Sequence, residues 1–265
     1  TGSATARRTG RLVDVVKSEW IKFRSVRSTK FTLAGAAVAM VAFGMIFSAT
    51  AGSGDAAPGP AAAFSDPVQL ALGAVNLTAM VVGVLGVLLI AGEYSTGLIR
   101  TTIAAVGNRL TVLRAKAAVL GGATAAVMGV ASVLALWLGQ AVYSGGQATM
   151  ALTDPDTIGV VLGTTAYVTG IALIGLALGA ILRSTASAIG VLVGGIFIGP
   201  PLLGLLPDWF SDNVLKYLPS EAGSAMMATV SDPYLLSTGT AYAVFAAWVL
   251  GLLGLAGILM RTRDA

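Results

Sequence analysis

Six long apolar stretches separated by polar connections dominate the chain. Each is close to the ~20 residues that an α-helix needs to cross the hydrocarbon core of a bilayer, and none contains Asp, Glu, Lys, Arg or His. Apolar residues occupy every face of these stretches, whereas a soluble helix would alternate apolar and polar faces. The pattern predicts an all-α polytopic membrane protein with six transmembrane helices in a single transmembrane domain. The predicted spans are residues 31–49, 68–91, 117–142, 157–181, 186–206 and 239–260.

The charged residues give these spans an orientation. When the connections are assigned alternately to two sides, one side receives 15 of the 16 Lys and Arg residues, and the other receives only Lys216 together with eight acids. Because cytoplasmic connections carry the excess of Lys and Arg, we expect both termini in the cytoplasm. The net charge of +4 then reflects topology rather than a nucleic-acid partner. The eight acids are Asp55, Asp66, Asp154, Asp156, Asp208, Asp212, Glu221 and Asp232.

The residue types that are missing narrow the function. The chain has no Cys and no His, which removes thiolate chemistry and the commonest metal ligand and general base. The polar residues within the spans are amides and hydroxyls, whereas ion-coupled transporters and voltage sensors use charged groups there. No lysine follows a glycine, so a Walker A motif does not occur. We expect a transport subunit rather than an enzyme, without a cofactor of its own, whose energy comes from a separate ATPase.

Residues 11–30, ahead of the first span, have the pattern of an amphipathic helix. Its apolar positions fall at helical spacing and are Leu12, Val15, Val16, Trp20 and Phe23. Basic residues such as Arg24 fall elsewhere on the helix, an arrangement typical of a helix in the cytoplasmic headgroup layer with Trp20 at the interface. Such a helix is either a simple anchor for the first span or a mechanical element.

The connection at residues 92–116 is longer than two antiparallel spans require. Glu93 lies where the second span leaves the bilayer, and a basic run from Arg109 to Lys116 ends the connection. Between them, Leu98, Ile99, Ile103 and Val106 predict a short amphipathic helix. Such a cytoplasmic element is suited to receiving force from a soluble partner. The alternative is a basic flank whose long side chains reach the headgroups.

The longest connection on the other side, residues 207–238, follows Pro200 and Pro201. Prolines at this place predict a kink or break near the end of the fifth span. Aromatic residues among polar ones, including Tyr234, predict short amphipathic or partly re-entrant helices, which we interpret as a lid over the outer end of a pathway. An ordinary folded loop is the alternative. Glycine pairs at four-residue spacing predict close helix packing, and those on the fifth span allow dimerisation as the alternative. The pairs are Gly175 with Gly179, Gly190 with Gly194 and Gly195 with Gly199.

Three segments together resemble the permeases of type 2 ATP-binding cassette (ABC) exporters. They are SEWIKFRSVRSTKFTL before the first span, GEYSTGLIRTT after the second with Arg109 and Lys116 further on, and YLPSEAGSAM before the last span. The resemblance covers nearly the whole chain and implies a multi-pass protein of the bacterial plasma (inner) membrane. Many relatives place a proline shortly before the basic residue, whereas Val106, Gly107 and Asn108 precede Arg109 here.

In that family the helix before the first span is a connecting helix, and the connection after the second span carries a coupling helix that docks on the ATP-binding subunit. The resemblance therefore implies a connecting helix with Trp20, Phe23 and Arg24. It also implies a coupling region, whose residues are Glu93, Tyr94, Gly97, Arg100, Arg109 and Lys116.

The resemblance further implies two copies of an ABC ATP-binding subunit, which bind ATP and Mg, and a second permease that is the same or a homologous chain. The substrate path would run between permeases, lined by the second and fifth spans. Candidate cavity residues are Asn76, Thr78, Met80, Ile189, Val193 and Phe197. Because the spans have no charge, we expect an apolar or amphipathic substrate such as a drug, an antibiotic peptide or a lipid. The alternative is a scaffold or sensor that recruits a cytoplasmic partner without transport.

Overall fold

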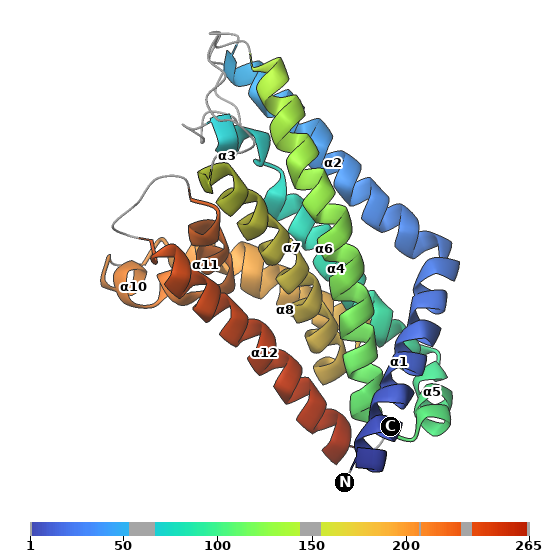
Figure 1. Cartoon of the computed structure of the whole chain (residues 1–265). Helices are drawn as coiled ribbons and strands as arrows, with labels where there is room; N and C mark the ends of the chain where they lie inside the picture. The colour runs from blue at the N-terminus through green and yellow to red at the C-terminus, as the bar shows by residue number, and fades with distance from the viewer. Residues whose placement is uncertain (1, 53–66, 144–154, 207, 229–234, 264–265) are drawn as a thin grey trace.

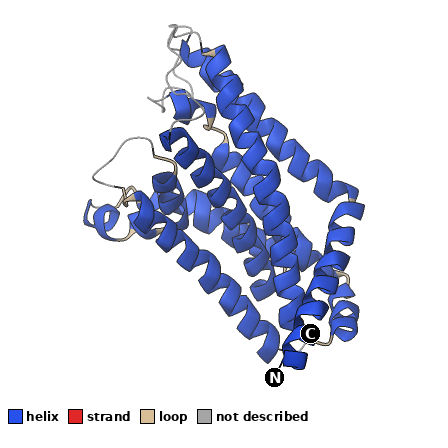
Figure 2. Ribbon diagram, in the orientation of Figure 1, coloured by secondary structure: helices blue, strands red, loops and turns tan. Residues whose placement is uncertain are grey.

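The computed structural model describes residues 2–52, 67–143, 155–206, 208–228 and 235–263. Over these ranges every regular element is a helix (Figure 2), as the hydrophobic pattern predicts. The long helices are α1 (Gly2–Ser25), α2 (Arg27–Gly52), α4 (Val75–Ser95), α6 (Arg109–Val142), α7 (Pro155–Leu182) and α12 (Thr238–Thr262). The shorter ones are α3 (Pro67–Ala71), α5 (Leu98–Val106), α8 (Thr185–Leu192), a π-helix η2 (Val193–Ile198), α9 (Gly199–Leu203), α10 (Asp208–Asn213), a 3₁₀ turn η3 (Leu215–Tyr217) and α11 (Pro219–Met226).

Six helical segments within the described ranges are long and apolar enough to cross a membrane, which confirms a multi-pass helical membrane protein. They overlap the six predicted spans, with ends that differ by up to eight residues, as at Arg109 against the predicted residue 117. They are Arg27–Thr50, Val68–Ser95, Arg109–Val142, Pro155–Leu182, Thr185–Leu203 and Thr238–Thr262. The two termini lie at the same end of the bundle (Figure 1). Four of the eight acids assigned to the outer side, Asp55, Asp66, Asp154 and Asp232, lie outside the described residues.

The two ends of the bundle are defined by different elements. We call the end that contains Arg109, Lys116, Arg183 and Arg263 the basic end, after these basic side chains. Hydrogen bonds and ion pairs of these side chains connect the helix ends there. We call the opposite end, where α3, the start of α7 and the end of α11 surround one pocket, the far end. Figure 1 shows α1 meeting α2 at an angle near the basic end, with α5 beside α1.

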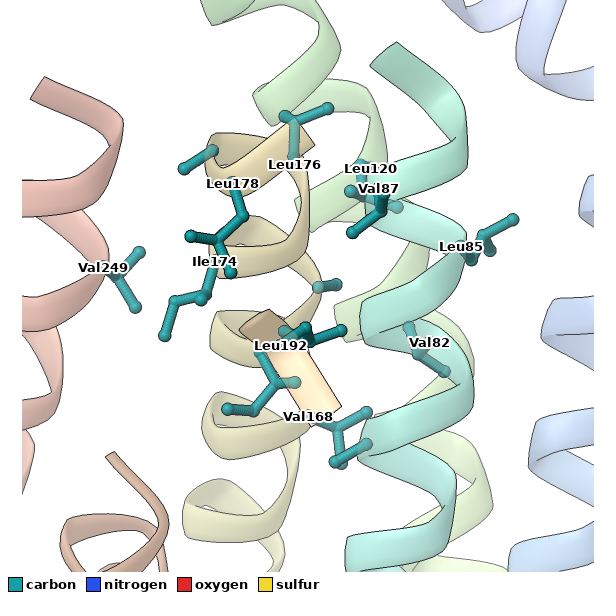
Figure 3. Close-up of a cluster of buried hydrophobic side chains, with 14 of the residues drawn as sticks. Val82, Leu85, Val87, Leu120, Val168, Ile174, Leu176, Leu178, Leu192 and Val249 are labelled. Carbon is teal, nitrogen blue, oxygen red and sulfur yellow. The ribbon is translucent and has the colours of Figure 1, made fainter. Parts of the chain in front are cut away.

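The centre of the bundle is the contact between α4 and α7. Apolar side chains from these helices, with Leu120 from α6 and Leu192 from α8, form one buried cluster (Figure 3). Glycines bring the two backbones together: a Cβ on Gly175 would overlap the backbone of Gly83, and one on Gly86 would overlap the carbonyl of Ala172. Between apolar helices in lipid, such close packing supplies the attraction. The predicted packing role is confirmed for Gly175 and Gly179.

Other glycines on the fifth span behave differently. A Cβ on Gly190, Gly194 or Gly195 would meet no atom within 4 Å, so these glycines do not pack closely against another helix of this chain, and dimerisation through the fifth span stays a prediction. Pro200 follows them, and the helix before it widens into η2 over Val193–Ile198. Pro200 lacks an N–H and its ring would strike the carbonyl of the preceding turn, and a π-helical turn accommodates both effects. The predicted kink is therefore a local widening, and the span continues as α9.

The boundaries of the two basic-end connections differ from those expected. The amphipathic helix α1 ends at Ser25, Val26 interrupts the helix, and α2 starts at Arg27. The basic run that begins at Arg109 forms the first turns of α6 rather than part of a connection, because apolar side chains alternate with the basic ones and continue the helix. The short amphipathic helix predicted within residues 92–116 is confirmed as α5.

The far-end segment at residues 207–238 contains short helices, as predicted. They are α10, η3 and α11, and Pro219 occupies the first turn of α11, where its missing N–H has no cost. The Trp248 indole N–H on α12 donates to the Tyr217 carbonyl at 2.8 Å, which fastens η3 to the last span. Tyr234, one of the aromatic residues on which the prediction rested, lies outside the described residues.

Candidate functional site at the basic end

Four charged side chains meet between three helices at the basic end. They are Glu19 and Lys22 on α1, Glu93 on α4 and Lys116 on α6, and we call them the ionic cluster. Lys116 Nζ lies 2.8 Å from Glu19 Oε2 and 2.7 Å from Glu93 Oε1. Lys22 Nζ lies 2.9 Å from Glu19 Oε1 and 3.6 Å from Glu93 Oε1. Two ammonium groups and two carboxylates thus neutralise one another.

Burial of the ionic cluster has a cost in solvation free energy. The side chains of Lys116 and Glu19 are only 5% and 6% exposed, and that of Glu93 is 16% exposed, whereas Lys22 is 47% exposed. Removing charges from water has a large cost that the attraction between them offsets only when the geometry is good. Such a cluster adds little net stability, but removing one partner leaves a buried charge uncompensated. The cluster therefore determines how α1 sits against α4 and α6.

The two α1 residues have shifted pKa values with opposing causes. Burial alone would raise the pKa of Glu19, but the charge and hydrogen bond of Lys116, with those of Lys22, outweigh burial and hold it below its ordinary 4.5. Burial alone would lower the pKa of Lys22, but Glu19 and Glu93 outweigh it and hold the pKa above its ordinary 10.5. Both groups are therefore charged at neutral pH.

The sequence of α1 explains how Glu19 reaches its partners. Val15, Glu19 and Phe23 follow one another at four-residue intervals, and all three are buried on the face toward the bundle. Trp20 is half exposed and its ring stacks on Phe23, with centroids 6.0 Å apart, whereas Arg24 is exposed. Sequence reasoning missed Glu19 and Lys22 as site residues. The signal was present, because a single acid interrupts the apolar stripe between Val15 and Phe23.

A second polar network ties the end of α12 to the basic end. Arg109 Nη1 donates to the carbonyls of Met260, at 3.0 Å, and Arg263, at 2.6 Å. Arg183 Nη2 donates to the same Arg263 carbonyl at 3.3 Å, and Arg263 Nη1 donates to the Ile181 carbonyl at 3.3 Å. Arginines at a helix C-terminus satisfy carbonyls that lack partners within the helix and complement its dipole. We call Arg109, Arg183 and Arg263 the arginine network.

The six predicted coupling residues divide between these arrangements. Glu93 and Lys116 join in the ionic cluster, and Arg109 belongs to the arginine network. Tyr94 lies under the Arg183 guanidinium, 5.2 Å from its ring centroid. Gly97 and Arg100 join neither network: Gly97 precedes α5 in the left-handed conformation, with φ of 73°, and Arg100 is exposed on α5. The sequence predicted the segment at residues 92–116 as a site but not which of its side chains pair with residues of other helices.

The turn without a proline before Arg109 has a defined geometry. Gly107 ends α5 in the left-handed conformation, with φ of 70°, which a glycine adopts without steric cost. Asn108 then begins α6 as its N-cap, and its side chain accepts the Leu110 backbone N–H at 3.0 Å. Gly107 thus ends α5 and Asn108 starts α6 without the proline that many of the permeases that the chain resembles have there.

The six candidate cavity residues lie in different surroundings within this chain, and the path between two permeases stays a prediction. Asn76 accepts a hydrogen bond from the Tyr167 hydroxyl at 3.1 Å and lines a far-end pocket of about 260 Å³. None of the other five lines that pocket. Thr78 is buried, and the other four are partly buried, with Ile189 and Phe197 packed against the core. These four are Met80, Ile189, Val193 and Phe197.

A larger pocket lies beside the ionic cluster. Its volume is about 720 Å³, and all four cluster residues line it together with parts of α2 and α5. We call it the basic-end pocket. Within the described ranges, no group of three or more Asp, Glu, His or Cys side chains is placed to hold a metal ion. Sequence reasoning did not predict this pocket, because residues from five separate helices form it.

The described residues thus define a multi-pass helical membrane protein with a buried ionic cluster at one end. No family model matches the chain, and its sequence matches no curated protein.

Proposed function

We propose that the chain is the transmembrane permease subunit of an ATP-driven ABC exporter. Two copies of a separate ATP-binding subunit would hold ATP and Mg, and a second permease, the same or a homologous chain, would complete the pathway. In this proposal the protein lies in a bacterial plasma (inner) membrane with the basic end and both termini in the cytoplasm. The basic residues of the connections support that orientation.

The observation that carries the proposal is the ionic cluster. It joins α1, α4 and α6, and Lys22 extends it to α5 through a 3.4 Å hydrogen bond to the Thr102 hydroxyl. Helix α5 is a short amphipathic element outside the spans with exposed residues, including Leu98 and Arg100. A partner that moves α5 would therefore move charged side chains attached to two spans. Contiguous packed and ion-paired elements are the physical means of such coupling.

The content of the spans supports an external energy source. The apolar cores of the six spans contain no charged residue, and the chain has no Walker A motif. A pathway without fixed charge also favours an apolar or amphipathic substrate, such as a drug, an antibiotic peptide or a lipid, because an ionic one would lose its hydration without compensation. ATP hydrolysis in a partner and transport here would then be separate tasks.

The first experiment is co-purification of the chain with a candidate ATP-binding subunit in lipid nanodiscs. ATP hydrolysis is then measured across a panel of amphipathic compounds and lipids. The proposal expects a stable complex whose hydrolysis rate rises with a subset of compounds. Partner binding with hydrolysis that no compound changes would favour a scaffold or sensor. Failure of every candidate subunit to associate would overturn the ABC proposal.

Two pairs of variants test the parts of the machinery. Glu93→Ala should abolish compound-stimulated hydrolysis while the complex still assembles, whereas Glu221→Ala, at the far end, should leave stimulation intact. Arg100→Glu on α5 should weaken association with the ATP-binding subunit, whereas Lys17→Glu reverses another exposed charge, on α1, and should not. Full stimulation with Glu93→Ala would remove Glu93 from the proposed machinery.

A further inference from the structure

The basic-end pocket has features that force transmission does not require. It lies where Val26 separates α1 from α2, with walls from α4, α5 and α6. Its volume of about 720 Å³ is within the range of sites for small molecules. One part of its wall is charged, because the ionic cluster forms it. Another part is apolar and includes Leu85, Leu88 and Leu89 of α4 and Val119 of α6.

One oxygen in the charged part has no donor. Glu93 Oε2 is buried and accepts no hydrogen bond from any residue that the structure describes, whereas Oε1 of the same carboxylate accepts from Lys116. The two nearby ammonium groups donate to other atoms: Lys116 donates to Glu19 Oε2 and Glu93 Oε1, and Lys22 donates to Glu19 Oε1 and the Thr102 hydroxyl. A buried carboxylate oxygen without a donor is costly. An N–H or O–H group beside Glu93 would satisfy this oxygen.

We propose that the basic-end pocket binds a primary ammonium group carried on an apolar chain. The ammonium donates to Glu93 Oε2, and the chain lies against Leu85 and Leu88. A charge-assisted hydrogen bond to a carboxylate is the strongest contact that this oxygen can make. An anionic head would instead be repelled by the unpartnered carboxylate oxygen. A quaternary ammonium has the charge but no N–H to donate.

This ligand chemistry has two sources. One is a bilayer phospholipid with a primary amine in its head, such as phosphatidylethanolamine, and the other is a free alkylamine amphipath. The break at Val26 places the pocket where an interfacial helix turns into a span, so either source reaches it from the membrane surface. The inference goes beyond the proposed transport function, because binding requires only this chain.

The test uses the full chain alone in phosphatidylcholine nanodiscs. Dodecylamine and dodecyltrimethylammonium are titrated separately, and bound copies per chain are counted by native mass spectrometry. We expect one saturable dodecylamine per chain and binding of the trimethyl analogue at least about tenfold weaker, because a buried acceptor discriminates against ligands that lack its donor. Equal affinity for the two amphipaths would overturn the proposal.

Matched variants locate the site. Glu93→Gln should weaken dodecylamine binding at least about tenfold through loss of the charged acceptor, whereas Glu221→Gln should not change it. Leu88→Trp should obstruct the apolar part and leave the ionic cluster intact. Its control is Leu77→Trp, on the same helix and similarly exposed, at 44% against 47% for Leu88, but outside the pocket. Unchanged binding in Glu93→Gln or in Leu88→Trp would overturn the assignment.

A competition step then identifies the source. If phosphatidylethanolamine in the nanodisc displaces dodecylamine, the site takes a bilayer lipid. If it does not, while dodecylamine still discriminates against its trimethyl analogue, the site takes free amphipaths. Both results support ammonium recognition. Because no ATP-binding subunit is present, failure of the proposed transport function would leave this result standing, and the reverse also holds.

Discussion

The centre of the bundle and its basic end are held together by different physics. At the centre, α4 and α7 approach so closely that Gly83, Gly86 and Gly175 leave no room for a Cβ, and the buried cluster around them is apolar. At the basic end, charged side chains bridge helices over specific distances, as in the contacts of Lys116 with Glu19 and Glu93. Close apolar packing resists any displacement, whereas ion pairs depend on charge state and on every partner being present. The first arrangement suits a fixed core, and the second suits an element that moves.

The largest effect in this comparison is expected at Lys116. Lys116→Met removes the buried cation between Glu19 and Glu93 and leaves only the half-exposed Lys22 beside the two carboxylates, so one buried charge is uncompensated. We expect a loss of about 4 kcal/mol in the free energy of unfolding. Chemical unfolding in detergent, followed by circular dichroism, measures it. Lys216→Met, at the far end, is the control. Recovery of most of the loss in the triple variant Glu19→Gln, Glu93→Gln, Lys116→Met would show that unpaired charge is the cause, and absence of recovery would contradict it.

The next largest effect is expected at the centre. Gly175→Val places a branched side chain against the backbone of Gly83, and we expect a loss of about 3 kcal/mol because neither backbone can shift within the packed core. Gly190→Val is the control, since its added Cβ meets no atom within 4 Å. Thermal unfolding of the two variants measures the difference. Equal losses would mean that the α4 and α7 contact is not the close approach described.

A smaller effect is expected in the arginine network. Arg109→Gln removes charged hydrogen bonds to the carbonyls of Met260 and Arg263 and should cost about 1–2 kcal/mol. The exposed Arg114, on the same helix, provides the control Arg114→Gln. Hydrogen exchange of the last turn of α12 should increase only in Arg109→Gln. An increase spread over the whole of α12 would instead indicate general unfolding.

How far the sequence predicts the structure differs between the two regions. The spans follow from hydrophobicity alone, because an α-helix satisfies its own backbone and lipid admits little else. The helix α5 follows from Leu98, Ile99, Ile103 and Val106, and the Gly175 packing from residue spacing. The ionic cluster does not follow, because Lys116 meets a partner 97 positions away, at Glu19, and spacing along one helix carries no information about another. The candidate cavity rested on resemblance, and among its residues only Asn76 lines a described pocket.

The smallest effect separates two carboxyl groups by their pH dependence. At the basic end the pKa of Glu19 lies below its ordinary 4.5, so its contribution to stability is complete above that value and is lost as the pH falls through the folded-state pKa. At the far end burial raises the pKa of Glu221 above 4.5, so its contribution is complete at lower pH and is lost as the pH rises through the folded-state pKa. Because the pKa of Lys22 lies above 10.5, its contribution to stability is lost only at high pH.

The contributions of Glu19 and Glu221 to stability change with pH in opposite directions, and substitution of each residue separates them. Glu19→Gln should flatten the fall of the melting temperature on acidification below pH 4.5, whereas Glu221→Gln should flatten the fall that begins as the pH rises above it. Each change should be smaller than the loss in Lys116→Met, because protonation leaves a neutral hydrogen-bonding group where that substitution leaves an uncompensated charge. Thermal unfolding across pH in detergent measures both. Identical pH profiles for the two variants would mean that Lys116 and Lys22 do not set the charge state of Glu19. The two carboxyl groups would then not differ in the direction of their pKa shifts.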